Sequence, residues 1–353
     1  MKSKILYYFP LLILLNFSVY QTLYAEIAKD SIADNMLSVV DSLNKINQPK
    51  EMYVHASRLL AYALDNKLEF YIGESNKYIG AYFTIINKLD SAYLYYKKAA
   101  HSYASISDSA REGKVYSIMA YRYYINNKSE EAFYYYKKAL DKLKNTEEYF
   151  WKGLVNDNIG FLSFEQGNYF DALKYYQDAL PEFLAIEKYE NVGRIYDKMA
   201  LVYRKTNDTD KEEEAYMSAI RYLSKIDTTV VLGMVYNNLS EIYLSREEIE
   251  KGLETLEKAK KIYLSLDYQR GLCSYYSVLA SYYSKHIPPD NEKVIVYCNL
   301  SLPIAEEYED FRQYADATST AGEAYLRMNQ PTKAINICTK GYEYADEYQL
   351  RPE

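Results

Sequence analysis

The sequence is poor in the residues that bend a backbone, with only 12 glycines and 8 prolines among 353 residues. An average soluble chain contains about 12% of the two together. Folds built from many hairpins need more of both residues, and so do glycine-rich phosphate-binding loops. The scarcity therefore argues against β-sandwiches, β-propellers and dinucleotide-binding folds.

Histidine and cysteine are also scarce, at three residues each. His55, His101 and His286 lie far apart, and no two have the spacing of metal ligands. No nucleophile motif, zinc-protease motif or phosphate-binding loop occurs in the sequence. We therefore expect no metal site, no cofactor and no enzymatic activity.

An excess of basic charge is missing as well. The chain has 42 Lys and Arg against 49 Asp and Glu, for a net charge of −7. Nucleic-acid binding depends on Lys and Arg that neutralise phosphates, so we expect no nucleic-acid partner. Tyrosine, by contrast, is abundant at 44 residues, and it must fill much of a core that is otherwise lean in aliphatic side chains.

Long hydrophobic runs are confined to the N-terminus. Lys2 and Lys4 precede the uncharged run 5–15, and Ala25 stands just before the first acidic residue. This order is typical of a secretory signal peptide, so we expect residues 1–25 to be removed near Ala25 and the protein to be exported, to the periplasm. The alternative is an uncleaved membrane anchor, because residues 5–24 carry no charge.

A repeat of 40 residues organises the rest of the chain. Small residues recur in what we expect to be the first helix of each repeat: Gly80, Ala120, Gly160, Ala200, Ser240, Ala280 and, after a two-residue insertion, Gly322. A second helix follows each of them, with two small positions seven residues apart and, in four repeats, a tyrosine between them: Tyr96, Tyr136, Tyr176 and Tyr216. Small residues let helices approach closely, and the tyrosine fills the groove between them. Turn signals such as Asn126-Asn127 and Gln166-Gly167-Asn168 separate the paired helices.

Residues 158–180 show the pattern in full, and they resemble a tetratricopeptide repeat. The resemblance covers about residues 33–348, or eight repeats, of which the first is degenerate with Met52, Ala56 and Leu59 at the second-helix positions. It implies an all-α fold, a right-handed α-solenoid of about eight helical hairpins. We assign residues 26–348 to this solenoid and residues 349–353 to a C-terminal tail. Cys298 and Cys338 take the tyrosine position in their repeats, so we expect core packing there, although an odd number of cysteines leaves a disulfide with another chain open.

The resemblance also implies a binding face. In this family the first helices line a concave groove, at positions three before, one after and four after the small residue. These positions nominate a set of groove residues for peptide binding: Tyr121, Tyr124, Asp157, Phe161, Phe164, Asp197, Arg204 and Asn237. The alternative for the aromatic members is packing against the neighbouring repeat.

Two functions follow from these features. The first is an extracytoplasmic scaffold that binds a protein or peptide partner in its groove. The second is a sensor module of a bacterial envelope signalling or transcription-regulatory system. A hydrolase or transferase has no support in the sequence.

Overall fold

The computed structural model describes residues 28–347, which form helices joined by short turns, with no strand among them. Residues 28–45 form the first helix. The bounds of the others are α2 (Pro49–Asn66), α3 (Glu69–Ile85), α4 (Leu89–Ser105), α5 (Ser109–Tyr124), α6 (Ser129–Leu143), α7 (Tyr149–Glu165), α8 (Tyr169–Ala185), α9 (Tyr189–Lys205), α10 (Thr209–Leu223), α11 (Val230–Ser245), α12 (Ile249–Ser265), α13 (Gln269–Lys285), α14 (Asn291–Glu307), α15 (Phe311–Arg327) and α16 (Pro331–Glu347). The all-α fold predicted from the repeat is confirmed. The predicted signal peptide and the C-terminal tail lie outside the described residues.

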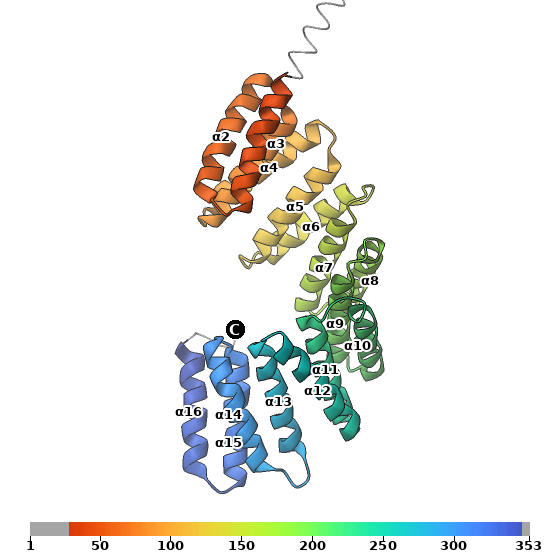
Figure 1. Ribbon diagram of the computed structural model, residues 1–353, viewed down its shortest axis with the longest axis vertical. Coiled ribbons are helices and arrows are strands. Elements are labelled where there is room, and N and C mark those ends of the chain that lie inside the picture. Colours follow the sequence, from red (N-terminus) through yellow and green to blue (C-terminus); the bar gives the residue numbers. More distant parts are fainter. Residues whose placement is uncertain (1–27, 348–353) are drawn as a thin grey trace, which may run out of the picture. The chain divides into compact units, whose positions relative to one another are not determined.

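The chain divides into two compact units, residues 1–162 and 163–353, and the division falls within α7. In each unit a first helix pairs with the second helix that follows it, and the pairs stack on one another, as α13 to α16 do in Figure 1. None of the described helices is long and apolar enough to cross a membrane.

The small residue of each first helix, which we call the anchor residue, lies in the core. The anchors Ala120, Ala200 and Ser240 are fully buried. In the helix of residues 28–45 the equivalent place belongs to Val40, which is also fully buried. The structure therefore contains the first, degenerate repeat as a complete helical hairpin, 28–45 with α2.

The tyrosines predicted to fill the grooves are buried as expected. Tyr96, Tyr136, Tyr176 and Tyr216 have at most 2% of their surface exposed. A Cβ atom on the anchor Gly80 would lie 2.9 Å from the ring of Tyr96, so the ring packs directly onto the glycine. Tyrosine thus replaces aliphatic residues in the core of this array.

Most helices are followed by a turn residue with left-handed backbone, and these residues recur about every 20 positions. Within repeats the left-handed residue is usually asparagine, as at Asn47, Asn87, Asn127, Asn207 and Asn329. Asparagine tolerates positive φ better than other non-glycine residues, because its side chain can hydrogen-bond locally. This explains how a chain with so little glycine makes so many tight turns.

Candidate functional site

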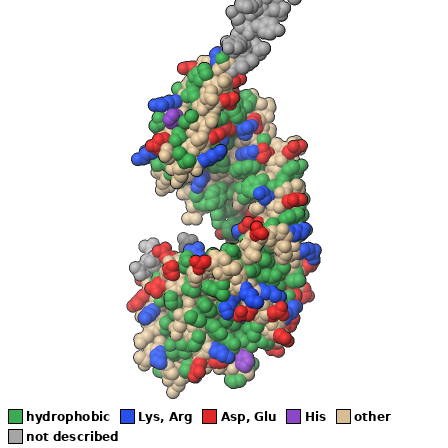
Figure 2. Space-filling model, viewed as in Figure 1, with side chains coloured by type: hydrophobic (Ala, Val, Ile, Leu, Met, Phe, Trp, Pro, Cys, Tyr) green, Lys and Arg blue, Asp and Glu red, His purple; other side chains and the backbone are tan. Residues whose placement is uncertain are grey.

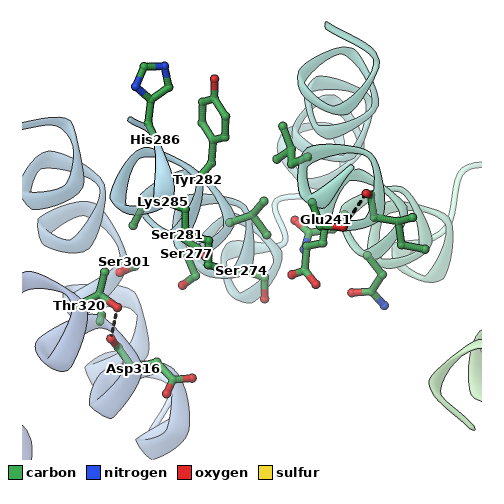
Figure 3. Close-up of a pocket in the computed structure, with 18 of the residues that line it drawn as sticks. Glu241, Ser274, Ser277, Ser281, Tyr282, Lys285, His286, Ser301, Asp316 and Thr320 are labelled. Carbon is green, nitrogen blue, oxygen red and sulfur yellow. Dashed lines mark hydrogen bonds between the residues drawn. The ribbon is translucent and has the colours of Figure 1, made fainter. Parts of the chain in front are cut away.

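A polar groove of about 1250 Å³ lies in the second unit. Most of its lining comes from α11, α13 and α15, the first helices of three successive repeats. The C-terminal end of α9, the loop after α13 and single residues or pairs of α10, α12 and α14 also contribute to the walls. Figure 3 shows Ser274, Ser277 and Ser281 along the middle helix, between Glu241 on one side and Asp316 and Thr320 on the other. The groove is therefore floored by small hydroxyl side chains and flanked by carboxylates.

The serines of α13 connect to α15 through an amide. Ser277 Oγ donates to Gln313 Oε1 at 2.7 Å, and Gln313 Nε2 donates to Ser274 Oγ at 3.4 Å. These bonds hold Gln313 in place across the floor. Ser281, one residue after the anchor Ala280, is only partly exposed and also lines the groove.

Arg204 organises the charged wall of the groove. Its Nε donates to Glu212 Oε1 at 2.6 Å, its NH2 group donates to the Tyr216 hydroxyl at 3.2 Å, and its NH1 group lies 3.4 Å from Glu241 Oε2. Glu212 is buried, with 6% of its side chain exposed. One guanidinium thus holds two carboxylates from different helices.

Asp197 is a third carboxylate beside this wall. Burial raises its pKa to about 6, although a hydrogen bond from Asn238 Nδ2 at 3.4 Å and the charge of Arg204 favour the ionised form. Removal from water also raises the pKa of Glu241, against the attraction of Arg204. Glu241 keeps 44% of its side chain exposed, so water screens it more than Asp197. Both carboxylates would gain from a further cation nearby.

Asn237 is a deeply buried polar residue that lines the groove. It is 4% exposed, and its Oδ1 atom has no hydrogen-bond partner among the described residues. A buried, unpaired amide oxygen costs about 1–3 kcal/mol, so a protein seldom retains one without a use.

The far end of the groove is basic and aromatic. Lys285 has no ion-pair partner within the described part of the chain, and its charge acts on Glu241 through space. Tyr282 and His286 project together from the end of α13 (Figure 3). His286 Nδ1 lies 2.9 Å from the carbonyl oxygen of Pro288, in the loop that carries the two-residue insertion.

The predicted site residues do not all lie together. Arg204 and Asn237 line the groove, and Asp197 lies beside it. Asp157, Phe161, Tyr121 and Tyr124 belong to the first unit, where Tyr124 and Phe161 meet edge to face at 5.9 Å. Phe164 packs against the core of the second unit, with its ring 5.8 Å from Tyr169. Tyr121 is 47% exposed.

Sequence reasoning missed the hydroxyl floor, although the rule for finding it was at hand. Ser277 and Ser281 stand three before and one after the anchor Ala280, and Ser319 stands three before Gly322. The predicted groove residues belong to the repeats with anchors Ala120 to Ser240, whereas these serines belong to the two repeats that follow, with anchors Ala280 and Gly322. Asp316 and Thr320 follow no such rule, since they reach the groove from other turns of α15.

Among residues 28–347, no group of His, Cys, Asp and Glu side chains could hold a metal ion. Cys273 and Cys298 are buried free thiols, and burial raises the pKa of each to about 11. Cys338 is free and exposed, so the expectation that it packs in the core is wrong. It lies in the last described helix, where no further repeat covers it.

Comparison with known proteins agrees with this architecture. Residues 153–225 match the family model of the tetratricopeptide repeat. No curated protein is significantly similar to the chain in sequence. Similar solved structures include the apo form of the quorum sensor NprR from B. thuringiensis, at 13% identity and a TM-score of 0.66 over 94% of both chains. The apo form of RapI matches at 13% identity and a TM-score of 0.61, over 80% of this chain and all of that one. Aspartyl phosphate phosphatase F from Bacillus subtilis matches at 18% identity and a TM-score of 0.59, over 82% of this chain and 74% of that one. At these identities the likeness concerns the fold.

Proposed function

We propose that the chain is a tetratricopeptide-repeat protein that binds an extended peptide, or a segment of a partner protein, in the groove of α11, α13 and α15. One observation carries this proposal: successive first helices line one continuous groove with Asn237, Ser277 and Ser319, each three residues before the anchor of its repeat. Repeated polar groups at a fixed spacing suit a ligand that is itself a regular chain.

The charge of the second unit favours a basic ligand. Residues 163–353 contain 22 Lys and Arg against 32 Asp and Glu, whereas residues 28–162 contain 18 against 16. Figure 2 shows acidic and basic side chains mixed over the visible face, so no single strong patch accounts for the difference. A Lys or Arg of the peptide would offset the unfavourable burial of Asp197 and Glu241.

Selection from a random peptide display library on the purified full chain tests the proposal. Enriched peptides should bind the protein and should lose at least tenfold in affinity to Ser281→Trp, because the indole would fill the floor of the groove. Ser265→Trp, at an exposed position outside the groove, is the matched control and should bind normally. Peptides that bind the two variants equally would place the binding face elsewhere.

A sensor role is the second candidate, and similarity to solved structures of sensor proteins favours it. The quorum sensor NprR shares the fold, and so does a P. horikoshii signal-transduction ATPase with a tetratricopeptide repeat sensor, at 17% identity and a TM-score of 0.64. This chain covers 48% of that ATPase. A sensor should convert ligand binding into movement between its units. Fluorescence energy transfer between labels at Ser105 and Ser265 should then change when a selected peptide binds, whereas a passive scaffold would give no change.

We place the protein outside the cytoplasm and assign it no catalytic activity. The basic start, the apolar run and Ala25 support export. Fusion of residues 1–40 to a reporter that is active only after export should give activity, and replacing Leu12 and Leu14 with Arg should abolish it. If the fusion is as inactive as the reporter without residues 1–40, export is contradicted. An activity lost on Glu241→Gln would contradict the non-catalytic assignment.

A further inference from the structure

Two positions of every first helix form the contact between successive repeats. They stand eight residues and one residue before the anchor. In the later repeats the second of these positions is buried to at least 94%: Ile79, Met119, Ile159, Met199, Leu239, Leu279 and Ala321. The position eight residues before the anchor is also covered, for example at Ile72, Val192, Leu272 and Tyr314, each at most 9% exposed. These are the stacking positions of the array.

The second helix of the preceding repeat covers them, with side chains 13 and 20 residues after its own anchor. Tyr53 and Leu60 of α2 pack around Ile79 of α3. In the same manner, Leu173 and Leu180 of α8 pack into the core that contains Val192 and Met199 of α9. Three of the seven interior junctions follow this scheme throughout, with two apolar second-helix residues over two apolar first-helix residues. At each of the other four, three of the four positions are uncharged and one carries a charged residue: Glu112, Lys152, Glu213 or Lys260.

The first helix of the chain keeps this pattern without the cover. Ile32 and Val39 occupy the two stacking positions of helix 28–45, and they are 50% and 42% exposed. Ile46, seven residues further, is 62% exposed. A solenoid end that faces water usually carries polar residues on its outer face, and this one does not.

The last described helix, α16, carries the second-helix side of such a junction. Ile335 and Tyr342 stand 13 and 20 residues after the anchor Gly322, and they are 65% and 71% exposed. At the same two positions of the seven earlier second helices, every residue is buried or half-buried. In Figure 1 α16 lies at the edge of its unit, with α14 and α15 to one side only. The residues that would cover a following repeat are in place, and no described helix uses them.

We propose that α16 of one copy docks on helix 28–45 of a second copy and so continues the stack head to tail. Ile335 then packs against Val39, and Tyr342 packs against Ile32, in the manner of the apolar interior junctions between α2 and α3 and between α8 and α9. The interior junction between α2 and α3 is the template for the contact. This inference is independent of the groove, which lies on other faces of the repeats.

Such a contact joins two different surfaces, so it does not close on itself as a two-fold dimer does. It propagates into a chain of copies, or into a ring if the rotation between copies closes. A linear assembly would keep one free stacking face at each of its two ends. The groove of every copy would remain open to ligand.

Sedimentation velocity on the full chain, over a range of concentrations, tests the proposal. Wild type should form a ladder of species that lengthens with concentration. The variant Ile32→Glu/Val39→Glu, damaged at the N-terminal face, should be monomeric, and Ile335→Glu/Tyr342→Glu, damaged at the C-terminal face, should be monomeric too. An equimolar mixture of the two variants should give a 1:1 dimer and nothing larger, since one intact face of each kind remains.

Phe170→Glu is the matched control, because Phe170 is 82% exposed but stands at neither end, and it should associate as wild type does. Helicity by circular dichroism should be unchanged in all variants, since the substituted side chains are exposed. A wild type that stays monomeric at every concentration would overturn the proposal. A dimer that persists when only one face is damaged would overturn it in favour of a two-fold contact.

Discussion

At the scale of single residues, a second column of close contacts runs through the array, seven residues before each anchor. Most first helices have glycine there, and a large side chain of the paired second helix packs onto it. The pairs are Gly73 with Tyr103, Gly113 with Leu143, Gly193 with Leu223 and Gly233 with Tyr263. Where the first helix has a larger residue the partner is small, as in the clusters that join Ala33 to Ala63 and Cys273 to Ala305. The sizes of the two residues are therefore matched within each repeat.

Gly193 offers a test of this matching. A Cβ atom there would lie 2.5 Å from Leu223 Cγ, so Gly193→Ala should lower the free energy of unfolding by about 1–3 kcal/mol. Leu223→Ala should cost about 2–5 kcal/mol through the cavity that it leaves. The double variant recreates the alanine pair of the first repeat, so urea unfolding should show it to be more stable than the sum of the two single effects. Strict additivity would mean that the two side chains do not share the space.

Asp197 gives stability a pH dependence whose sign can be worked out. Its pKa is raised to about 6, above the unfolded value near 3.9, so the folded state binds its proton first as the pH falls. The ionised carboxylate therefore destabilises the fold above pH 6, and this penalty disappears as the pH falls from 6 to 4. Asp197→Asn should stabilise the protein by roughly 1 kcal/mol at pH 7.5 and by much less at pH 4.5. Equal effects at both values would show that the aspartate titrates normally.

The residue scale is also where sequence reasoning succeeded and failed most clearly. Tyr96, Tyr136, Tyr176 and Tyr216 were found because their spacing repeats in register with the anchors. The glycine column escaped notice because its partner lies about 30 residues away on another helix, and no local pattern links the two. Further tyrosines stack in pairs across a repeat, such as Tyr123 with Tyr135 at 5.2 Å and Tyr283 with Tyr297 at 5.7 Å. Tyrosine contributes most where two half-buried rings can cover each other.

At the scale of the elements, helix starts differ in how they are capped. Asp108, Asp208, Asp290, Asp310 and Thr229 accept a hydrogen bond from a backbone N–H of the first turn, whereas Lys88, Lys128 and Lys188 occupy the same place without one. The capped helices satisfy an N–H group that otherwise depends on water. These caps do not recur with the repeat, so they stabilise individual helices.

Removing one cap should therefore be costly only where the bond exists. Asp310 Oδ1 accepts from Gln313 N at 3.1 Å, and Asp310→Ala should cost about 1 kcal/mol in thermal or urea unfolding. Lys188→Ala, at an N-cap that makes no side-chain bond, should change stability little. If both substitutions cost the same, capping is not the source of the difference.

Elements were the easiest part to predict. The turn signals at Asn126-Asn127 and Gln166-Gly167-Asn168 separate helices in the structure, and the two-residue insertion before Gly322 falls in the loop between α13 and α14. What the sequence could not show was which helices enclose the groove. That depends on the sizes of side chains brought together from three repeats, and the small serines of α13 leave the space.

At the scale of the whole molecule, the chain consists of two units that differ in charge, with the acidic excess in residues 163–353. In an array of this kind each repeat contacts only its neighbours, so a local change should stay local. The fold could be predicted from the repeat for this reason, since the same pairing of helices recurs from one repeat to the next. The division into two units within α7 has no counterpart in the repeat pattern.

Hydrogen exchange should reveal this locality. Gly193→Ala weakens the packing of α9 on α10, so exchange should become faster in α9 to α11 while residues 28–125 keep their protection. The same measurement on the Gly113→Ala variant, with Leu143 Cγ 2.6 Å from the added Cβ, should give the reverse pattern. Loss of protection over the whole chain in either variant would show that the units unfold together.

The size-matched pairs seven residues before each anchor have a consequence for how such a chain can grow. Both members of a pair belong to the same repeat, so a gene segment cut between a second helix and the next first helix carries its pair intact. A cut between the two helices of one repeat would join a glycine to the wrong neighbour, or two large side chains to each other. Duplication and recombination should therefore be tolerated at the turn between two repeats and rejected at the turn between the two helices of one repeat.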